Sequence, residues 1–305
     1  MAELILENGV FRARVVPECG GNVVSLRHLA SGAPLLKSPR EPEELRRFPA
    51  RFGMPVLFPP NRIADGSFAF GGGRYRLPIN EAATHNHLHG LALGKPWELL
   101  RAERDAAELR FAFTPAAPEF GGFPFAFTLE RRVELTRSGL LDQMKVTNAG
   151  DREMPLGLGY HTTFPAPVKM RISAGSREIV IGDRFLPTGE SVPWREFDPR
   201  RWFDPKGRNC GFHTRSEALT REDGSLLHGA ELLYDAGLLR YATDEKFSFW
   251  YTWNKRGEGD FISVEPISWM ADALNREDPV SAGVRVLAPG GEAVFCNELV
   301  FFARG

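Results

Sequence analysis

Glycine and proline divide this chain into short segments, and this punctuation constrains its fold more than any other feature. There are 31 Gly and 23 Pro among the 305 residues, and turn signals such as Asn8-Gly9 and Asp65-Gly66 recur at short spacing. No long window has helical periodicity, and only Glu41–Phe48 and Ala271–Asn275 are predicted to form short helical turns. Many short strands at short spacing favour an all-β sandwich or barrel over alternating βαβ units.

Apolar and polar residues alternate over Arg131–Leu135 and Leu140–Val146, which is typical of half-buried antiparallel strands. Two polar stretches, Lys37–Arg51 and Phe197–Gly224, are expected to be long surface excursions. Because the sequence has no internal repeat or low-complexity tract, residues 1–305 are predicted to form one domain. The predicted strands are Leu4–Leu6, Phe11–Val16, Gly21–His28, Phe68–Phe70, Arg74–Leu77, Trp97–Glu103, Glu108–Pro115, Phe125–Leu135, Gly139–Asn148, Met154–His161, Val168–Ser173, Glu178–Ile181, Ala230–Asp235, Leu238–Ala242, Phe247–Trp253, Asp260–Pro266, Ser281–Leu287 and Glu292–Phe302.

The charge balance argues against several classes of partner. The 38 basic and 39 acidic residues leave a formal net charge of −1, so no basic surplus attracts nucleic acid or an anionic membrane. The first ten residues lack the basic segment and apolar core of a signal peptide, and no apolar run approaches a membrane span. Cys19, Cys210 and Cys296 are scattered and odd in number, which argues against disulfides or a thiolate metal site. We expect a soluble, cytoplasmic protein.

Two predicted strands each carry one acid–base group. In Gly157-Leu158-Gly159-Tyr160-His161, extended geometry places His161 on the face of the two glycines. Glycines within a strand indicate close approach by another backbone, or space left for a ligand. In Phe261–Pro266, Glu265 lies on the less apolar face. An imidazole and a carboxylate are the minimum set for general acid–base chemistry on a small polar substrate. Taken alone, each residue is more often a structural histidine or a surface charge.

Further polar side chains lie between residues 60 and 90. Arg62 can donate several hydrogen bonds to hydroxyl oxygens, although an arginine after a turn is more often a surface residue. If the following segment is extended, His85, His87 and His89 share one face, as in a metal site. No nearby carboxylate or thiolate completes a ligand set, so a metal and a sugar hydroxyl are equal alternatives for this cluster.

Trp250, Trp253 and Trp269 lie in the same third of the chain as Glu265. A sugar ring has apolar C–H faces and a rim of hydroxyl groups, so aromatic faces beside polar donors suit it. The glycines near His161 and the tryptophans near Glu265 therefore favour a functional role for these two residues.

Taken in order, four segments resemble the aldose 1-epimerases (galactose mutarotases). The match is collinear and covers nearly the whole chain, including Leu186-Pro187-Thr188-Gly189-Glu190. It implies a galactose-mutarotase-like fold, a large twisted antiparallel β-sandwich that binds the sugar on a concave sheet face without metal or cofactor. The four segments are Asn61-Arg62-Ile63-Ala64-Asp65-Gly66-Ser67-Phe68, Asn86-His87-Leu88-His89-Gly90 with Lys95-Pro96-Trp97-Glu98, Gly157-Leu158-Gly159-Tyr160-His161, and Val264-Glu265-Pro266 ending at Ala273-Leu274-Asn275.

The resemblance also implies roles for individual residues. The catalytic base corresponds to Glu265 and the catalytic acid to His161, while Arg62 and His89 correspond to sugar-binding residues. The acid and base are expected on opposite sides of the acetal carbon, too far apart for a tight hydrogen bond to each other. The charge of Glu265 is expected to favour the imidazolium form of His161. Asn61 and Trp253 complete the expected sugar-binding set.

One part of the family pattern is missing. Many members carry a Leu-Asp-His-x-Phe motif whose Asp binds a sugar hydroxyl, and here the region reads Leu226-Leu227-His228-Gly229-Ala230. His228 is the first candidate to replace that Asp, with Asp235 or His213 as weaker ones. Since this group contacts hydroxyls remote from C1, its loss bears on sugar preference more than on chemistry.

The sequence therefore predicts an aldose 1-epimerase acting on a monosaccharide, as a monomer or homodimer. A hexose-6-phosphate epimerase is one alternative, because it would share the acid–base pair but need a cationic pocket for the phosphate. A non-catalytic sugar-binding domain is the other, although it should lack one member of the pair. The arginines available for a phosphate pocket are Arg46, Arg47, Arg51 and Arg74.

Overall fold

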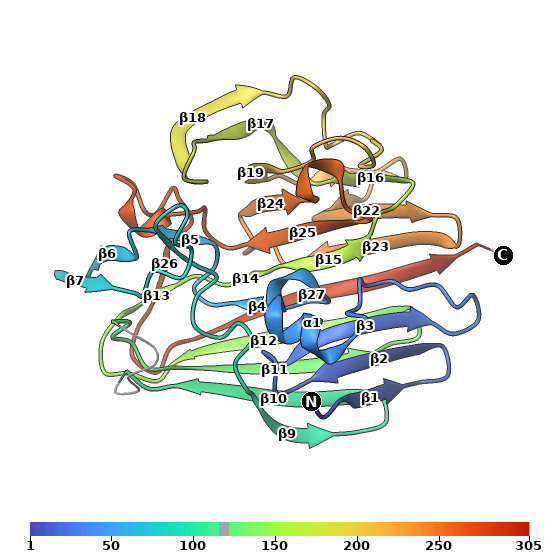
Figure 1. Cartoon of the computed structure of the whole chain (residues 1–305), viewed down its shortest axis with the longest axis horizontal. Coiled ribbons are helices and arrows are strands. Elements are labelled where there is room, and N and C mark those ends of the chain that lie inside the picture. The colour runs from blue at the N-terminus through green and yellow to red at the C-terminus, as the bar shows by residue number, and fades with distance from the viewer. Residues whose placement is uncertain (116–121, 305) are drawn as a thin grey trace.

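Two large antiparallel sheets dominate the computed structural model, which describes residues 1–115 and 122–304 (Figure 1). The first sheet has eight strands, and its long central members alternate buried and half-buried residues, as the sequence predicted for β11 and β12. In spatial order it contains β16 (Lys169–Ile172), β22 (Gly229–Tyr234), β23 (Gly237–Thr243), β27 (Glu292–Ala303), β12 (Gly139–Asn148), β11 (Phe127–Leu135), β10 (Ala106–Phe113) and β9 (Glu98–Ala102).

The second sheet is also eight-stranded and carries the residues of functional interest. Its strand β25 has β24 on one side and both β14 and β15 on the other, so successive parts of the chain share one partner. In spatial order it contains β18 (Pro187–Pro193), β17 (Ala174–Ile181), β19 (Phe212–Ser216), β24 (Phe249–Trp253), β25 (Phe261–Ile267), β14 (Gly159–Tyr160) and β4 (Val56–Leu57), with β15 (Thr162–Pro165) beside β25.

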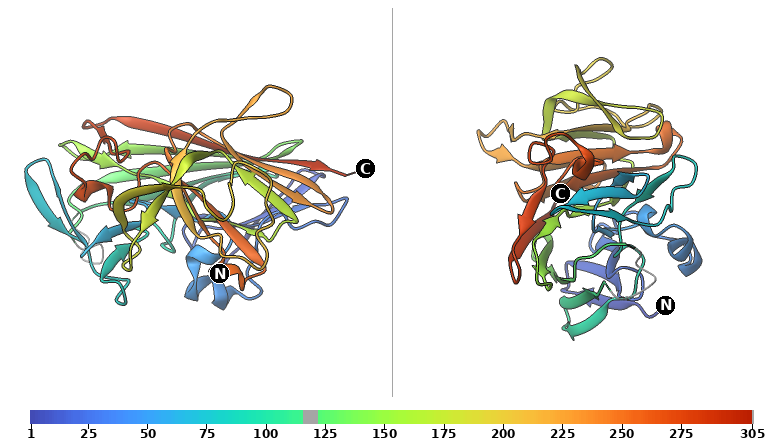
Figure 2. Two further views of the ribbon diagram at one scale, coloured as in Figure 1. Left: turned by 90° about the horizontal axis from the view of Figure 1, so that it is seen from above. Right: turned by 90° about the vertical axis from the view of Figure 1, so that its left-hand side faces the viewer.

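Smaller elements surround the two large sheets, and two of the helical segments match the predicted helical turns (Figures 1 and 2). The helical elements are α1 (Pro42–Arg47) and the 3-10 turns Pro49–Arg51, Lys255–Gly257 and Ala273–Asn275. A three-stranded sheet contains β1 (Leu4–Glu7), β2 (Phe11–Val16) and β3 (Asn22–His28). Two-stranded pairs are β5 (Arg62–Ala64) with β8 (Asn86–Leu88), β6 (Ser67–Phe70) with β7 (Gly73–Arg76), β13 (Met154–Leu156) with β26 (Arg285–Leu287), and β20 (Leu219–Thr220) with β21 (Leu226–Leu227).

One hydrophobic core joins the two large sheets. Leu129 and Leu299 contribute from the first sheet, and Trp250, Ile262 and Val264 contribute from the second. Burial of this apolar surface is the main favourable term in folding. In the part of the chain that the structure describes, no helix is long and apolar enough to span a membrane.

Two sequence predictions about strands were wrong. The polar stretch Phe197–Gly224 is not wholly a surface excursion, because it contains β19, which is buried at Phe212–Thr214 in the second sheet. The predicted strand Met154–His161 is divided into β13 and β14, and His161 lies between β14 and β15. Strand β19 was missed because its surrounding segment has a polar composition. The predicted strand Met154–His161 is interrupted because its pairing partner changes from β26 to β25.

Candidate active site

The His161 and Glu265 side chains are in direct contact, with Nε2 of the imidazole 3.1 Å from Oε1 of the carboxyl group. The cause is strand register: Gly159 pairs with Ile267 and Thr162 with Val264, so His161 lies directly opposite Glu265. Opposite residues on antiparallel strands project from the same face with their Cβ atoms close together. The expectation that the two groups stand too far apart to hydrogen-bond was therefore wrong.

Burial dominates the electrostatics of this pair, since the residues are only 6% and 2% exposed. Desolvation lowers the pKa of His161 to about 4 and raises the pKa of Glu265 well above its usual value. The expected preference for imidazolium does not hold here, because the cost of burying charge outweighs the attraction of the carboxylate. Both shifts favour the uncharged forms, so burial favours neutral imidazole and carboxylic acid over the ion pair at this contact.

Tyr251 and His213 extend the pair into a row across the sheet. Register places Tyr251 of β24 opposite Glu265, and His213 of β19 opposite Tyr251, so His161, Glu265, Tyr251 and His213 share one face. His213 is fully buried, and its Nδ1 lies 2.9 Å from the carbonyl oxygen of Trp250. Burial raises the pKa of Tyr251, so its phenol remains a hydrogen-bond donor. We call these four residues the catalytic row.

Sequence reasoning missed Tyr251, although the signal was available. Trp253 was predicted as a site residue, and period-two alternation places Tyr251 on the same face of β24. Trp253 lies beside the row, with its ring centre 6.3 Å from that of His161. The other two tryptophans are core residues: Trp250 donates its indole N–H to Ser173 and Trp269 to Pro60.

The two glycines before His161 accommodate protein side chains. A Cβ at Gly157 would lie 2.3 Å from the Trp269 ring, and a Cβ at Gly159 would lie 2.7 Å from Ile267 and 2.8 Å from Pro60. The interpretation that these glycines leave space for a ligand was wrong, because Trp269, Ile267 and Pro60 fill that space.

Arg62 approaches the catalytic row from β5. Its Nε and Nη2 donate to the two oxygens of Glu81 at 2.9 and 2.7 Å. It also lies close enough to Tyr251 and Glu265 to lower the pKa of each. Asn61 connects two predicted site residues, since its side-chain oxygen accepts from the Arg62 backbone N–H and its carbonyl accepts from the His89 backbone N–H, each at 2.9 Å.

The histidine cluster diverges, and only His89 faces the row. Its ring meets that of His161 edge to face at 5.3 Å, and burial lowers its pKa well below the usual value. His85 instead contacts Asp65 at 2.8 Å, and His87 contacts the carbonyl oxygen of Pro78 at 2.8 Å. The three imidazoles do not share a face, because His85 and His89 both adopt left-handed backbone conformations. The described residues contain no group of three or more His, Cys, Asp or Glu side chains that could hold a metal ion.

His228 lies away from the catalytic row. Its Nε2 is 3.2 Å from Ser216 Oγ and its Nδ1 is 3.4 Å from Thr243 Oγ1. Ser216 is three residues along β19 from His213, a rise of about 10 Å. Asp235 is in the turn between β22 and β23, in the other large sheet. Of the three candidates for the missing Asp, the structure brings only His213 into the row.

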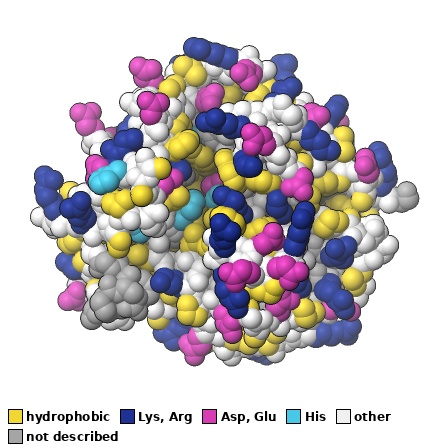
Figure 3. Space-filling model, viewed as in Figure 1, with side chains coloured by type: hydrophobic (Ala, Val, Ile, Leu, Met, Phe, Trp, Pro, Cys, Tyr) yellow, Lys and Arg dark blue, Asp and Glu magenta, His cyan; other side chains and the backbone are white. Residues whose placement is uncertain are grey.

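Figure 3 shows histidine side chains reaching the surface near the middle of one face, among hydrophobic and basic side chains. The contacts described above combine an acid–base pair, a guanidinium, a phenol and aromatic rings at one site. Such a set suits proton transfer on a small molecule rich in hydroxyl groups.

Comparison with solved structures shows that the chain has a galactose mutarotase-like fold. It superposes with a TM-score of 0.86 on the galactose mutarotase-like protein of Clostridium acetobutylicum, at 26% identity over 98% of this chain and 95% of that one. The aldose epimerase homologue from C. elegans gives a TM-score of 0.81 at 15% identity, covering 100% of this chain and 99% of that one. The Aldose 1-epimerase family model matches residues 3–277. The chain belongs to the aldose 1-epimerase family.

Among curated proteins, the uncharacterized protein YihR of Escherichia coli is 34% identical over 124 residues. That match spans 40% of this chain and 38% of the relative. This partial match leaves the substrate open.

Proposed function

We propose that this protein is an aldose 1-epimerase that interconverts the α and β anomers of a free aldohexose. The observation that carries the proposal is the buried His161–Glu265 contact, in which burial lowers the pKa of the imidazole and raises that of the carboxyl group. Ring opening needs one proton removed from the C1 hydroxyl and one delivered to the ring oxygen, so the pair returns to the same proton count.

In this mechanism, proton transfer from Glu265 to His161 prepares the reactive carboxylate and imidazolium. The carboxylate takes the proton of the C1 hydroxyl, the imidazolium protonates the ring oxygen, and the bond between C1 and that oxygen breaks as the C1 carbonyl forms. After rotation about the C1–C2 bond, the reverse transfers close the ring on the other face of C1. These proton transfers require that the bound sugar separate the His161 and Glu265 side chains, which are in contact in the free protein.

The remaining row and rim residues would bind the sugar. Arg62 and Tyr251 are donors beside Glu265, and His89 is an imidazole kept neutral by burial next to His161. Trp253 supplies an aromatic face, Asn61 holds Arg62 and His89 together, and His213 lies at the far end of the row.

Polarimetry of freshly dissolved α-D-glucose and α-D-galactose tests this function. The wild-type protein should accelerate the approach of optical rotation to equilibrium, and Glu265→Gln should not. A wild-type protein that leaves every neutral and phosphorylated aldose at the uncatalysed rate would refute the function and favour a sugar-binding domain.

A second candidate, an epimerase for aldoses with an anionic group on C6, is favoured by two arginines. The Arg47 and Arg51 guanidinium carbons lie 5.1 and 4.0 Å from the centre of the Phe48 ring, and Arg51 is 5.8 Å from that of Trp253. Neither arginine has a carboxylate partner among the described residues, and Arg51 is close enough to His161 to lower its pKa. If His161 serves the ring oxygen, the C6 substituent lies on the same side.

The other arginines of the predicted phosphate pocket do not join this pair. Arg46 forms an exposed ion pair with Glu43, and Arg74 is on β7 in a separate hairpin. Comparing α-D-glucose with α-D-glucose 6-phosphate decides between the candidates. Arg51→Ala should lower kcat/KM for the phosphate alone if the second holds, with Arg46→Ala as the matched control. Equal effects of Arg51→Ala on both sugars would exclude an anion site there.

A further inference from the structure

We propose that Glu81 is the positioning residue for the Arg62 guanidinium and that its charge keeps Arg62 from pairing with Glu265. This inference rests on the proposed function of the same site. Arg62 uses its Nε–Nη2 edge for Glu81, in the paired geometry that makes arginine–carboxylate contacts strong and directional. Tyr251 also hydrogen-bonds to the guanidinium, so a sugar would use the N–H groups that remain. The two side chains are 13% and 19% exposed, so water screens this ion pair little.

A cation–π contact with Phe185 also restrains the Arg62 guanidinium. The ring of Phe185 lies over Arg62, with 4.9 Å between its centre and the guanidinium carbon, a cation–π geometry. Phe185 is in the turn between β17 and β18, and it has a left-handed backbone with φ 58°. Glu81 and Phe185 therefore restrain the same guanidinium from two separate segments.

Glu81 is itself held in place. Its carboxylate accepts hydrogen bonds from the Thr84 hydroxyl and, at 3.1 Å, from Asn86 Nδ2. Burial alone would raise the pKa of Glu81, but the hydrogen bonds from Arg62 and Thr84 lower it, so the group stays ionised.

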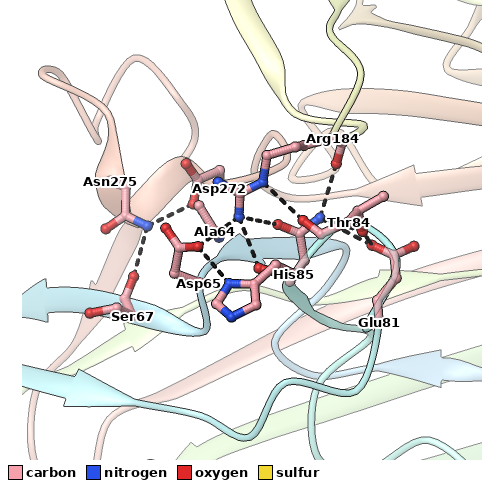
Figure 4. Close-up of polar contacts among 10 residues, drawn as sticks. Ala64, Asp65, Ser67, Glu81, Thr84, His85, Arg184, Asp272 and Asn275 are labelled. Carbon is pink, nitrogen blue, oxygen red and sulfur yellow. Dashed lines mark hydrogen bonds and ion pairs between the residues drawn. The ribbon is translucent and has the colours of Figure 1, made fainter.

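Arg184 fastens the two segments together (Figure 4). It donates to the carbonyl oxygens of Thr84 and His85 at 2.9 and 2.8 Å and to Asp65 Oδ1 at 2.8 Å. In return, the Arg184 carbonyl accepts from Asn86 Nδ2 at 2.9 Å. The residue before Phe185 is thus bonded to the loop that carries Glu81, which sets both restraints on Arg62 at once.

The charge of Glu81 also bears on the catalytic pair. Arg62 acts on two carboxyl groups: it pairs with Glu81, and it lowers the pKa of the otherwise strongly raised Glu265. If Glu81 lost its charge, the uncompensated guanidinium would favour the Glu265 carboxylate more strongly. It would also disfavour the His161 imidazolium, on which Arg62 already acts. Both effects lower the pKa values of the pair.

Two variants distinguish the role of Glu81 in positioning Arg62 from the effect of its charge. In Glu81→Gln the side chain keeps its size and loses its charge, whereas Arg184→Ala loosens the loop and keeps that charge. Glu81→Gln should raise KM for the sugar about ten- to a hundred-fold, as expected for a lost charge-assisted contact, and move the pH–rate profile to lower pH. Arg184→Ala should raise KM and leave the pH–rate profile in place.

Controls make the test specific. Glu43→Gln removes an exposed carboxylate that pairs with Arg46 and should change neither KM nor the pH profile. An NMR titration of His161 in the sugar-free protein should show a lower pKa in Glu81→Gln than in wild type. Because that measurement needs no turnover, it judges Glu81 even if the wild-type protein fails the polarimetric test of function. If Glu81→Gln does not fold, Thr84→Val removes one donor to Glu81 and should raise KM by a smaller factor.

The proposal is overturned if folded Glu81→Gln has the KM, the pH profile and the His161 pKa of wild type. It is also overturned if Glu43→Gln produces the same shifts, since the effect would then be one of net charge.

Discussion

Among the described residues, two pairs of acidic and basic residues have both side chains less than a tenth exposed, and they behave differently. Arg131 and Asp142 lie in the first sheet, with completely buried side chains 2.6 Å apart, and His161 and Glu265 lie in the second, 3.1 Å apart. Burial disfavours charge in both pairs. Because a guanidinium cannot lose its proton in a protein, Arg131 stays charged, and Asp142 raises its pKa against the effect of burial. Arg131 also donates to the carbonyl of Gly21 at 2.8 Å.

In the second pair, imidazole and carboxyl groups have ordinary pKa values about two units apart. Burial reverses their order here, because it lowers that of His161 to about 4 and raises that of Glu265. The same physical term thus makes a fixed structural ion pair in one sheet and a pair able to exchange a proton in the other. The pKa of the basic partner decides which.

The largest effect is expected when the proton-exchanging pair is broken. Glu265→Gln keeps the shape and removes the base, so kcat should fall about a hundred- to ten-thousand-fold with little change in KM. His161→Asn should act similarly, and the double variant should be little worse than either, because the two residues act as a unit. Polarimetry measures all three variants. Near-wild-type turnover in Glu265→Gln would exclude Glu265 as the base.

The structural pair should respond in stability. Asp142→Ala leaves the Arg131 charge buried without its partner, which should cost about 3–5 kcal/mol in the free energy of unfolding. Urea denaturation measures this loss, and the folded fraction should keep its kcat. The double variant Arg131→Met/Asp142→Leu should recover most of the loss, because an apolar pair of similar volume avoids desolvating charge. A loss below about 1 kcal/mol in Asp142→Ala would show that the pair is not held as described.

The pH dependence of stability distinguishes the pairs further. The pKa of His161 is about 4 in the folded protein and about 6.5 in the unfolded chain, so the unfolded chain binds more protons in between. The contribution of His161 to stability should therefore be complete above pH 6.5 and fall by up to about 3 kcal/mol on acidification to pH 4, while the raised pKa of Glu265 contributes with the opposite sign. Chemical denaturation at several pH values should therefore compare wild type with His161→Asn: the stability of wild type relative to this variant should fall on acidification, while Arg131 keeps its charge throughout this range. An unchanged slope would contradict the low pKa.

The smallest effect is expected away from both pairs. His228→Ala removes contacts with Ser216 and Thr243 and should alter the relative rates on glucose and galactose by less than about twofold. His213→Asn changes the end of the catalytic row and should alter this ratio more. Polarimetric rates on the two sugars compare the variants directly. A changed sugar ranking in His228→Ala alone would restore it as the replacement for the missing Asp.

Much of this architecture follows from local sequence. The alternation over β11 and β12 and the many turn signals predicted an all-β sandwich or barrel, and the family resemblance implied the antiparallel sandwich. The observed β12 has the predicted bounds, Gly139–Asn148. The buried strand β19 was missed, because its Phe212-His213-Thr214 core contains two polar residues and lies within a polar stretch. Local composition cannot show that a partner strand will bury such residues.

The site was predictable as a set of residues but not as a geometry. His161 and Glu265 were identified, yet their contact depends on the register between strands about a hundred residues apart, which neither segment encodes. Glu81 had no sequence signal at all, because its importance comes from the Arg62 side chain that reaches it. Tyr251 was within reach, since it alternates with Trp253.

The catalytic row also limits how the sugar preference of this protein can change. Three of its four side chains stand on adjacent strands of one sheet, and the fourth, His161, lies opposite Glu265 between β14 and β15. Neighbouring strands keep a separation of about 4.8 Å set by backbone hydrogen bonding. The distance from the acid–base end to His213 therefore comes in whole strand steps, and no gradual widening is available. A larger or smaller sugar has to be accommodated by substituting a side chain at a fixed position on the sheet, or by a change in the loops that carry Glu81 and Phe185. A change of sugar specificity therefore requires the replacement of a side chain, because the strand spacing sets the distances between the functional groups.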